Sequence, residues 1–484
     1  MSSALEGLKP ENVWKYFGEI SAIPRGSKNE AAVSNYVYET VVRLGLEAKR
    51  DAAGNVVAKK PPSFGRQEVR SVCLQGHLDM VCEKNADVEH DFSKDPIRIA
   101  REENILRAEG TTLGADNGIG VATMLAILED KSLEHGPIEC LFTVDEETGL
   151  TGASNLEPGF VESRMLINLD SEDEGTLYVG CAGGKDTVGS WKLETDSAPP
   201  GAIPAAVEVK GLCGGHSGLD IHKGRGNAIK MLGRVLLRLS ELGVRLAEIH
   251  GGNKRNAIPR EARAVVYLPK SRARKAERLV PEWEATLKAE VKAVDPDLSI
   301  RMARLSEGPG RVLKRGLQKR ILATLSALPH GVAKMSAEIP ELVETSTNVA
   351  VIGTTPEKIE VATSQRSSVK SEIDEIAEAV ANVLALGGAA VEQGSGYPGW
   401  KPNLKSYILS VAKEVHERVF GKPAEVKAVH AGLECGIIGE KFPGMDMVSL
   451  GPTLEEVHTP KERIYIDTVE RFWRYLLEIL KTVR

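Results

Sequence analysis

Five short segments that combine a carboxylate or a histidine with a glycine or an apolar run place the strongest constraint on how this chain can fold. Four of them end a strand-like run or begin the connection after one. Ligands bind at the carboxyl ends of the strands in open α/β sheets, so we expect these four segments to meet at one edge of a sheet. The five segments are Gln75–Asp79, Gly114–Gly118, Val144–Gly149, Asn168–Asp170 and Glu456–Pro460.

Helical and strand-like patterns alternate over about the first 185 residues, which predicts an α/β domain with a mostly parallel central sheet. The strand-like runs are short and apolar throughout, as in strands that are buried on both faces. We expect helices over residues 11–20, 28–44 and 118–128, and strands over residues 70–74, 138–144 and 165–169.

The 484 residues are too many for one ordinary core, so at least two domains are expected. The run Ser197–Gly201 is typical of a connector, and the sequence beyond it resembles two successive α+β units. The fifth segment lies near the C-terminal end, so a shared site requires the chain to return to the first domain. We therefore expect a host domain of residues 1–188 and 393–484, interrupted by an inserted α+β domain of residues 189–392.

Charge and composition argue against several classes of partner. A net charge of -6 gives no reason to expect nucleic acid or an anionic membrane. The basic run Lys270–Lys275 has no interleaved aromatic residue and fits a solvated helix face. No apolar run approaches the ~18 residues of a membrane span, and the first residues lack the pattern of a signal peptide. The six cysteines are dispersed, so we expect reduced thiols and a cytoplasmic protein.

Together the five segments supply two histidines and at least three carboxylates, which is the ligand set of a two-metal hydrolytic site. Two divalent cations carry a charge of +4, and three carboxylates with a bridging hydroxide bring the centre to neutrality, as a partly dry cleft favours. Mixed imidazole and carboxylate ligands suit zinc, with cobalt or manganese as substitutes.

Each segment taken alone also has an ordinary structural explanation. Asp116-Asn117-Gly118 has the composition of a turn, and aspartate is a good helix N-cap. The run Asp145–Glu147 fits an exposed acidic turn, and His458 fits an unremarkable loop histidine. Three adjacent carboxylates repel one another unless cations or water offset them, which favours the shared site.

The motifs and their order resemble those of the co-catalytic zinc exopeptidases, a family that includes carboxypeptidase G-type enzymes, succinyl-diaminopimelate desuccinylase and dipeptidases. The resemblance covers nearly the full length and rests on Gly76–Val81, Asp145–Gly149 and Gly214–Gly218 in combination. It implies a zinc-exopeptidase-like catalytic domain, formed by the host segments, and a lid formed by the inserted domain. Within the family the chain is most similar to dipeptidases, which implies hydrolysis of Xaa-His dipeptides or of dipeptides in general.

The resemblance also implies a ligand role for each matching residue around two zinc ions per chain. Asp116 would bridge both metals. His77 and Asp170 would complete the shell of one metal. Glu147 and His458 would complete the shell of the other.

Two further carboxylates receive catalytic roles from the same resemblance. Glu146 would be the general base that passes a proton from the attacking hydroxide to the leaving amine. Asp79 would orient His77 or tune the metals.

Substrate contacts are implied for residues in four other segments. His216 would stabilise the developing oxyanion from the inserted domain. The guanidinium of Arg366 suits bidentate capture of a terminal carboxylate. Glu434 could hold the free amino group, and Asn256 and His430 are further candidates. Glycine-rich turns and a surface arginine are the alternative explanations for these segments.

Two rival functions stay open at this point. An aminoacylase or carboxypeptidase of the same family would also use Arg366, whereas capture of a free amine by Glu434 favours a dipeptidase. A metal-binding protein without catalytic activity is the alternative from another class. The protein could be a monomer or a homodimer, and His216 could serve its own subunit or a neighbour.

Overall fold

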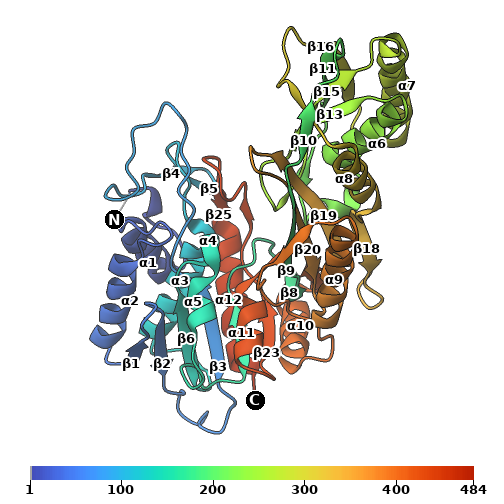
Figure 1. Cartoon of the computed structure of the whole chain (residues 1–484). Helices are drawn as coiled ribbons and strands as arrows, with labels where there is room; N and C mark the ends of the chain where they lie inside the picture. The colour runs from blue at the N-terminus through green and yellow to red at the C-terminus, as the bar shows by residue number, and fades with distance from the viewer. Residues whose placement is uncertain (1–2) are drawn as a thin grey trace. The chain divides into compact units, whose positions relative to one another are not determined.

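The chain forms two compact units in the computed structural model, which describes residues 3–484. The first unit comprises the chain up to residue 180 together with residues 400–428 and 433–484, and the second comprises residues 181–399 and 429–432. The blue N-terminal segments and the red C-terminal helices α11 (Glu434–Lys441) and α12 (Ile466–Thr482) both belong to the first unit (Figure 1).

The limits of the second unit follow from strand pairing. The strands β9 (Gly183–Lys192) and β21 (Ala390–Gln393) pair with each other in the sheet of this unit. The boundaries predicted from the sequence, after residues 188 and 392, pass through these two strands.

The first unit is built around an eight-stranded sheet that is parallel at its centre. Parallel pairing joins β3 to β6 and β7, and β7 to β23, whereas β1 and β2 are antiparallel at one edge. Every residue of β3, β6 and β7 is buried, as expected for strands covered on both faces. The sheet order is β1 (Glu47–Arg50), β2 (Val56–Lys60), β6 (Ile138–Thr143), β3 (Val72–His77), β7 (Met165–Asn168), β23 (Asp446–Ser449), β8 (Thr176–Cys181) and β22 (Glu425–Val429).

The central helix of this unit, α3 (Ala115–Glu129), is apolar on all sides and almost completely buried. Its first turn is irregular, because Asp116 and Asn117 have non-helical backbone angles and a cis peptide bond joins them. A Cβ at Gly76 would lie 2.1 Å from Oδ1 of Asn117, so only glycine lets β3 approach this turn. Besides α3, α11 and α12, the α-helices of the unit are α1 (Glu11–Ser21), α2 (Ala31–Arg43), α4 (Glu146–Gly149), α5 (Thr151–Asn155) and α10 (Tyr407–Phe420).

A small four-stranded sheet ties the C-terminal segment to the early part of the chain. It has the order β24 (Leu454–Glu455), β25 (Arg463–Tyr465), β5 (Ile105–Ala108) and β4 (Ile99–Glu102). Because β25 pairs with β5, the loop between β24 and β25 is held beside the start of α3.

The second unit contains one nine-stranded sheet, which passes through both of the α+β segments expected from the sequence. Its helices are α6 (Ala228–Glu241), α7 (Ala273–Val291), α8 (Arg315–Ala327) and α9 (Lys370–Leu386). The sheet order is β16 (Ser299–Arg304), β11 (Ile203–Lys210), β15 (Ala262–Leu268), β13 (Arg245–Gly251), β19 (Val343–Thr354), β20 (Lys358–Ser367), β9 and β21, with β18 (Gly331–Met335) paired to β19. Two short pairs accompany it, β10 (Thr195–Ser197) with β17 (Arg311–Leu313) and β12 (Gly215–His216) with β14 (Ala257–Ile258).

Some elements differ from their predicted extents. The helix expected over residues 28–44 begins only at Ala31. Lys28 has a positive φ of 70°, and its N–H donates a hydrogen bond to the side chain of Glu30, so the chain is not helical before Ala31. The strand expected over residues 70–74 continues to His77, since parallel pairing with β6 extends to that residue. None of the helices within residues 3–484 is long and apolar enough to cross a membrane.

Candidate metal centre

Three adjacent strands of the first unit have their carboxyl ends at the same edge of the sheet. β3 lies between β6 and β7, and the register aligns His77 with Thr143 and Gln75 with Asn168. His77 is the last residue of β3, and the chain reaches the turn at Glu146 just after β6 and Asp170 just after β7. The sheet edge expected from the sequence is therefore present.

Asp116 connects the two histidines of the site. Its Oδ1 lies 3.1 Å from Nε2 of His77, and its Oδ2 lies 3.1 Å from Nε2 of His458. The two oxygens of one carboxylate thus face two different imidazoles.

Two groups of ligand atoms share Asp116. One consists of Asp116, His77 and Asp170, and the other of Asp116, Glu147 and His458; within each group the ligand atoms lie within 4.8 Å of one another. Nε2 of His77 is 3.3 Å from Oδ1 of Asp170, and Nε2 of His458 is 3.0 Å from Oε1 of Glu147. This arrangement can hold two cations side by side with Asp116 between them.

Asp79 sets the orientation of His77. It is fully buried, and its Oδ1 lies 3.3 Å from Nδ1 of His77. If the ring carries its proton on Nδ1, the lone pair of Nε2 faces the carboxylates of Asp116 and Asp170, and a metal cation or a second proton between these groups makes that contact favourable. Oδ1 of Asp170 and Oε1 of Glu147 are also buried and face the imidazoles of His77 and His458, so the donor set fits cations.

The electrostatics of the site also attract positive charge. Hydrogen bonds with Asp116 and Glu147 raise the pKa of His458 to about 11, although its side chain is 49% exposed. Burial lowers the pKa of His77, but Asp170 and the neighbouring carboxylates together raise it well above the ordinary value. Burial raises the pKa of Asp170 to about 7.

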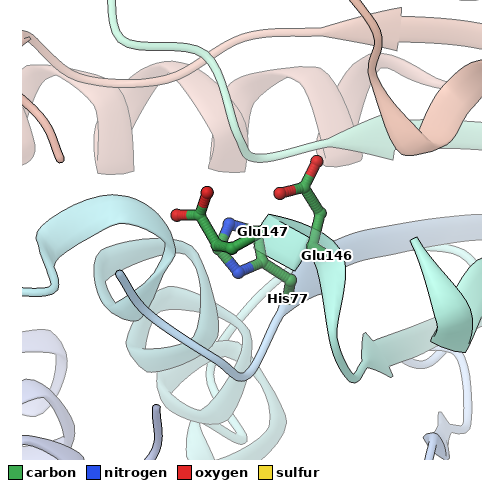
Figure 2. Close-up of side chains that lie close together, drawn as sticks. All are labelled: His77, Glu146 and Glu147. Atoms are coloured by element: carbon green, nitrogen blue, oxygen red, sulfur yellow. The ribbon is translucent and has the colours of Figure 1, made fainter. Parts of the chain in front are cut away.

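The three adjacent acids after β6 have different surroundings. Asp145 is buried and accepts hydrogen bonds from the hydroxyls of Thr148 and Thr151, so it stabilises the turn. Glu146 and Glu147 are the first residues of α4, and their side chains point in different directions near His77 (Figure 2). Burial raises the pKa of Glu146 well above its ordinary value.

A second acidic group, formed by Glu30, Asp79 and Asp145, is held together by hydrogen bonds. Glu30 accepts the N–H of Lys28 and of Asp145. Asp79 accepts the hydroxyl of Ser27 at 2.8 Å. These donors explain why the three carboxylates lie together in the core.

Glu434 is buried near the metal centre and belongs to a network of hydrogen-bonded polar side chains. Its Oε2 accepts hydrogen bonds from Nε2 of Gln75 and from the hydroxyl of Thr143, both at 2.6 Å. Asn168 donates in turn to Oε1 of Gln75 at 2.6 Å. Oε1 of Glu434 has no partner within residues 3–484, and burial raises the pKa of this carboxyl to about 7.

The other candidate substrate residues belong to the second unit. Arg366 and His430 are buried, and Nε2 of His430 lies 2.7 Å from the hydroxyl of Ser346. His216 is near His430, since a Cβ at Gly218 would lie 3.1 Å from the ring of His216 and 2.0 Å from the carbonyl oxygen of His430. Burial, and after it the charge of Arg366, lowers the pKa of both histidines. Asn256 approaches the His216 loop through its backbone carbonyl, which accepts the N–H of Ser217, while its side chain is exposed.

Two residues that support the centre carry no recognisable local signal in the sequence, and a third carries only a weak one. Arg25 is buried and donates to the carbonyls of Leu78 and Asp79 at 2.9 and 2.8 Å. Glu462 accepts backbone N–H groups at the start of α3. Burial and the charges of Asp116 and Asp170 raise the pKa of Glu172 to about 8, and its place two residues after Asp170 is the one clue to it.

Comparison with known proteins agrees with this architecture. The model of peptidase family M20/M25/M40 matches residues 73–482. The chain is 38% identical over 482 residues to the cytosol non-specific dipeptidase of Escherichia coli K12, with 99% of each protein covered. It is 42% identical to aminoacylhistidine dipeptidase from Vibrio alginolyticus, with a TM-score of 0.92 and coverage of 100% of this chain and 98% of the other.

A more distant structure shows the same fold. The aminopeptidase PepT from Bacillus cereus has a TM-score of 0.57 at 17% identity and covers 98% of each chain. The predicted α/β fold with a mostly parallel central sheet is confirmed, as is the prediction of a hydrolytic enzyme whose near relatives are dipeptidases. The chain belongs to peptidase family M20/M25/M40.

Proposed function

We propose that this protein is a metal-dependent dipeptidase that cleaves Xaa-His or a broad range of dipeptides with the help of two zinc ions. The position of Asp116 between His77 and His458 carries the proposal, since it gives two ligand groups with one shared carboxylate. The names of the two similar dipeptidases support the choice of substrate class.

The residues divide into metal ligands and groups that act on the substrate. His77, Asp116 and Asp170 would hold one cation, and Glu147 and His458 would join Asp116 around the other. Bound there, the ions would supply Lewis acidity and lower the pKa of water.

Glu146 is the proposed proton carrier. Its carboxylate would take a proton from the attacking water and deliver it to the leaving nitrogen. A ligand atom of Glu146 lies within 4.8 Å of ligand atoms of His77 and Glu147, but Glu146 belongs to neither of the two groups that share Asp116. Asp79 would keep the proton of His77 on Nδ1 and thereby present Nε2 as a ligand.

Glu434 distinguishes a dipeptidase from an aminoacylase. Two donors satisfy its Oε2, and the free Oε1 is a buried acceptor next to the metal centre. A substrate ammonium group would satisfy that acceptor, whereas an N-acyl group brings no positive charge. This contrast favours a free amino terminus as the feature recognised.

The second unit would contribute substrate contacts through His216, Asn256, Arg366 and His430. His216 would donate from Nε2 to the developing oxyanion, because its Nδ1 already accepts the N–H groups of Gly218 and Leu219. We further propose a cytoplasmic location, in line with the name of the Escherichia coli relative.

A substrate panel on metal-reconstituted protein tests the proposal. Free dipeptides, their N-acetylated forms and tripeptides would be assayed after chelation and after addition of zinc, cobalt or manganese. We expect free dipeptides to be hydrolysed far faster than their N-acetylated forms or tripeptides, with activity restored by metal at about two ions per chain. Preference for N-acetylated substrates would establish an aminoacylase, and no turnover with any metal would contradict an enzyme.

A further inference from the structure

Four residues of the second unit form a row across adjacent strands. Ser346 on β19 pairs with Arg366 on β20, and Arg366 pairs with Gly184 on β9. Gly184 in turn bridges to Tyr397. Residues directly opposite each other on neighbouring strands face the same side of a sheet, so Arg366 and Tyr397 present their side chains on one face with Gly184 between them.

The bare position at Gly184 lets the two side chains meet. A Cβ at Gly184 would lie 2.6 Å from the ring of Tyr397 and 2.7 Å from its hydroxyl oxygen. Two backbone hydrogen bonds, at 3.0 and 2.9 Å, fix Tyr397 beside Gly184. The phenol ring therefore lies over β9 and brings its hydroxyl to the guanidinium of Arg366.

The hydrogen bond between the two side chains leaves donors free. Nη1 of Arg366 donates to the hydroxyl oxygen of Tyr397 at 3.0 Å, so the phenol proton is still available. Nε of Arg366 is buried without a hydrogen-bond partner within residues 3–484. No carboxylate in this range forms an ion pair with Arg366, although its side chain is only 7% exposed.

The neighbouring titratable groups do not neutralise this charge. His430 and His216 lie near Arg366, and burial lowers their pKa values to about 3 and about 4. Both imidazoles are therefore neutral at pH 7. A buried guanidinium without a counter-ion is unfavourable unless a ligand provides the negative charge.

We propose that the hydroxyl of Tyr397 and the guanidinium of Arg366 together bind the C-terminal carboxylate of the substrate, which makes Tyr397 a specificity residue. A carboxylate has two oxygens, one for the planar N–H groups of Arg366 and one for the phenol proton. The inference rests on the proposed dipeptidase activity and adds to it a requirement for a free C-terminus.

The simplest competing explanation is that the hydroxyl only supports Arg366 by packing. Replacement of Tyr397 by phenylalanine separates the two explanations, because it removes one oxygen and keeps the ring over Gly184. Ala-His and its C-terminal amide would be compared as substrates, since the amide lacks the charge and one acceptor.

For Tyr397→Phe we expect kcat/KM for Ala-His to fall about tenfold or more, mainly through KM, with kcat/KM for the amide unchanged. The ratio of kcat/KM for the two substrates does not depend on the fraction of the protein that is folded. Tyr407→Phe, on α10 of the first unit, is the matched control and should leave the ratio unchanged. Equal losses on both substrates, or no loss on either, would overturn the proposal.

If the wild-type protein hydrolyses no dipeptide, the proposed function fails separately. Calorimetric binding of Ala-His and its amide to both proteins then decides the carboxylate site. Tighter binding of the acid that is lost in Tyr397→Phe supports it, and equal binding of acid and amide by the wild type contradicts it.

Discussion

The carboxylate of Glu462 accepts a hydrogen bond from the backbone N–H of Asp116 at 3.3 Å, across 346 positions of sequence. It also accepts the N–H groups of Leu113, Gly114 and Ala115 at 2.7, 2.9 and 2.8 Å, and it is only 2% exposed. His458, four residues earlier, contacts the side chain of Asp116. One C-terminal segment thus holds both the backbone and the carboxylate of the proposed bridging ligand.

This relationship predicts that Glu462→Gln weakens metal binding without touching a ligand. An amide has one acceptor oxygen and turns a donor toward backbone N–H groups, so the start of α3 should loosen. We expect zinc affinity to fall about tenfold and stability to fall by about 1–3 kcal/mol, measured by competition with a chromophoric chelator and by denaturant unfolding. Glu470→Gln, at an exposed position of α12, is the control; equal zinc affinity in both variants would contradict this role.

Asp79→Asn tests the orientation of His77. Asp79 also accepts the N–H groups of Glu146 and Glu147 at 3.0 and 3.2 Å, so it connects one ligand to the turn that carries the next. Loss of the carboxylate should lower metal affinity 10–100-fold, the effect typical of a lost carboxylate partner of a metal-bound histidine. Asp91→Asn, in an exposed loop, serves for comparison, and a variant that binds zinc as tightly as the wild type would show that Asp79 is not needed for orientation.

Glu434→Gln should change the choice of substrate. A neutral amide cannot offset an ammonium group, so we expect kcat/KM for free dipeptides to fall at least tenfold, with little change for N-acetylated ones. Burial raises the pKa of Glu434 to about 7, so activity that depends on its charged form should rise as the pH increases through that value. Glu440→Gln, exposed on the same helix, should behave as the wild type; parallel losses on both substrate classes would argue against amine recognition.

Acid should destabilise the protein partly through His430. Its pKa is about 3 in the folded chain, against an ordinary value of 6.5, so below pH 6.5 the unfolded chain binds a proton that the folded chain does not. The free energy of unfolding therefore falls as the pH drops from 6.5 toward 3, by at most about 1.4 kcal/mol per pH unit from this residue.

His430→Asn should flatten that dependence between pH 7 and pH 5, as measured by denaturant unfolding at each pH. The exposed His250→Asn should not. An unchanged slope in His430→Asn would mean that the histidine titrates normally in the folded protein.

The sequence allowed prediction of the residues that follow apolar strands. His77 and Asp170 lie at or just after the ends of apolar runs, which predict buried strands. Parallel strands bring residues at their carboxyl ends together. The split among Asp145, Glu146 and Glu147 was not visible in composition, since it depends on the hydroxyls that bind Asp145.

Residues whose contacts lie far away in the sequence cannot be predicted from local patterns. Arg25 and Glu462 contact backbone groups far away in sequence, and no local spacing marks such contacts. Tyr397 carries no local signal for the same reason, because its partner Arg366 contacts it across Gly184 of β9.

The most direct test of the account is the combined metal content and turnover of Glu146→Gln. Because Glu146 is proposed to move a proton and not to hold metal, the variant should retain about two zinc ions per chain while kcat falls by 10²–10⁴. Glu147→Gln should instead lose metal. Dipeptide turnover by Glu146→Gln at the wild-type rate, or loss of its zinc together with activity, would contradict the assignment of the base.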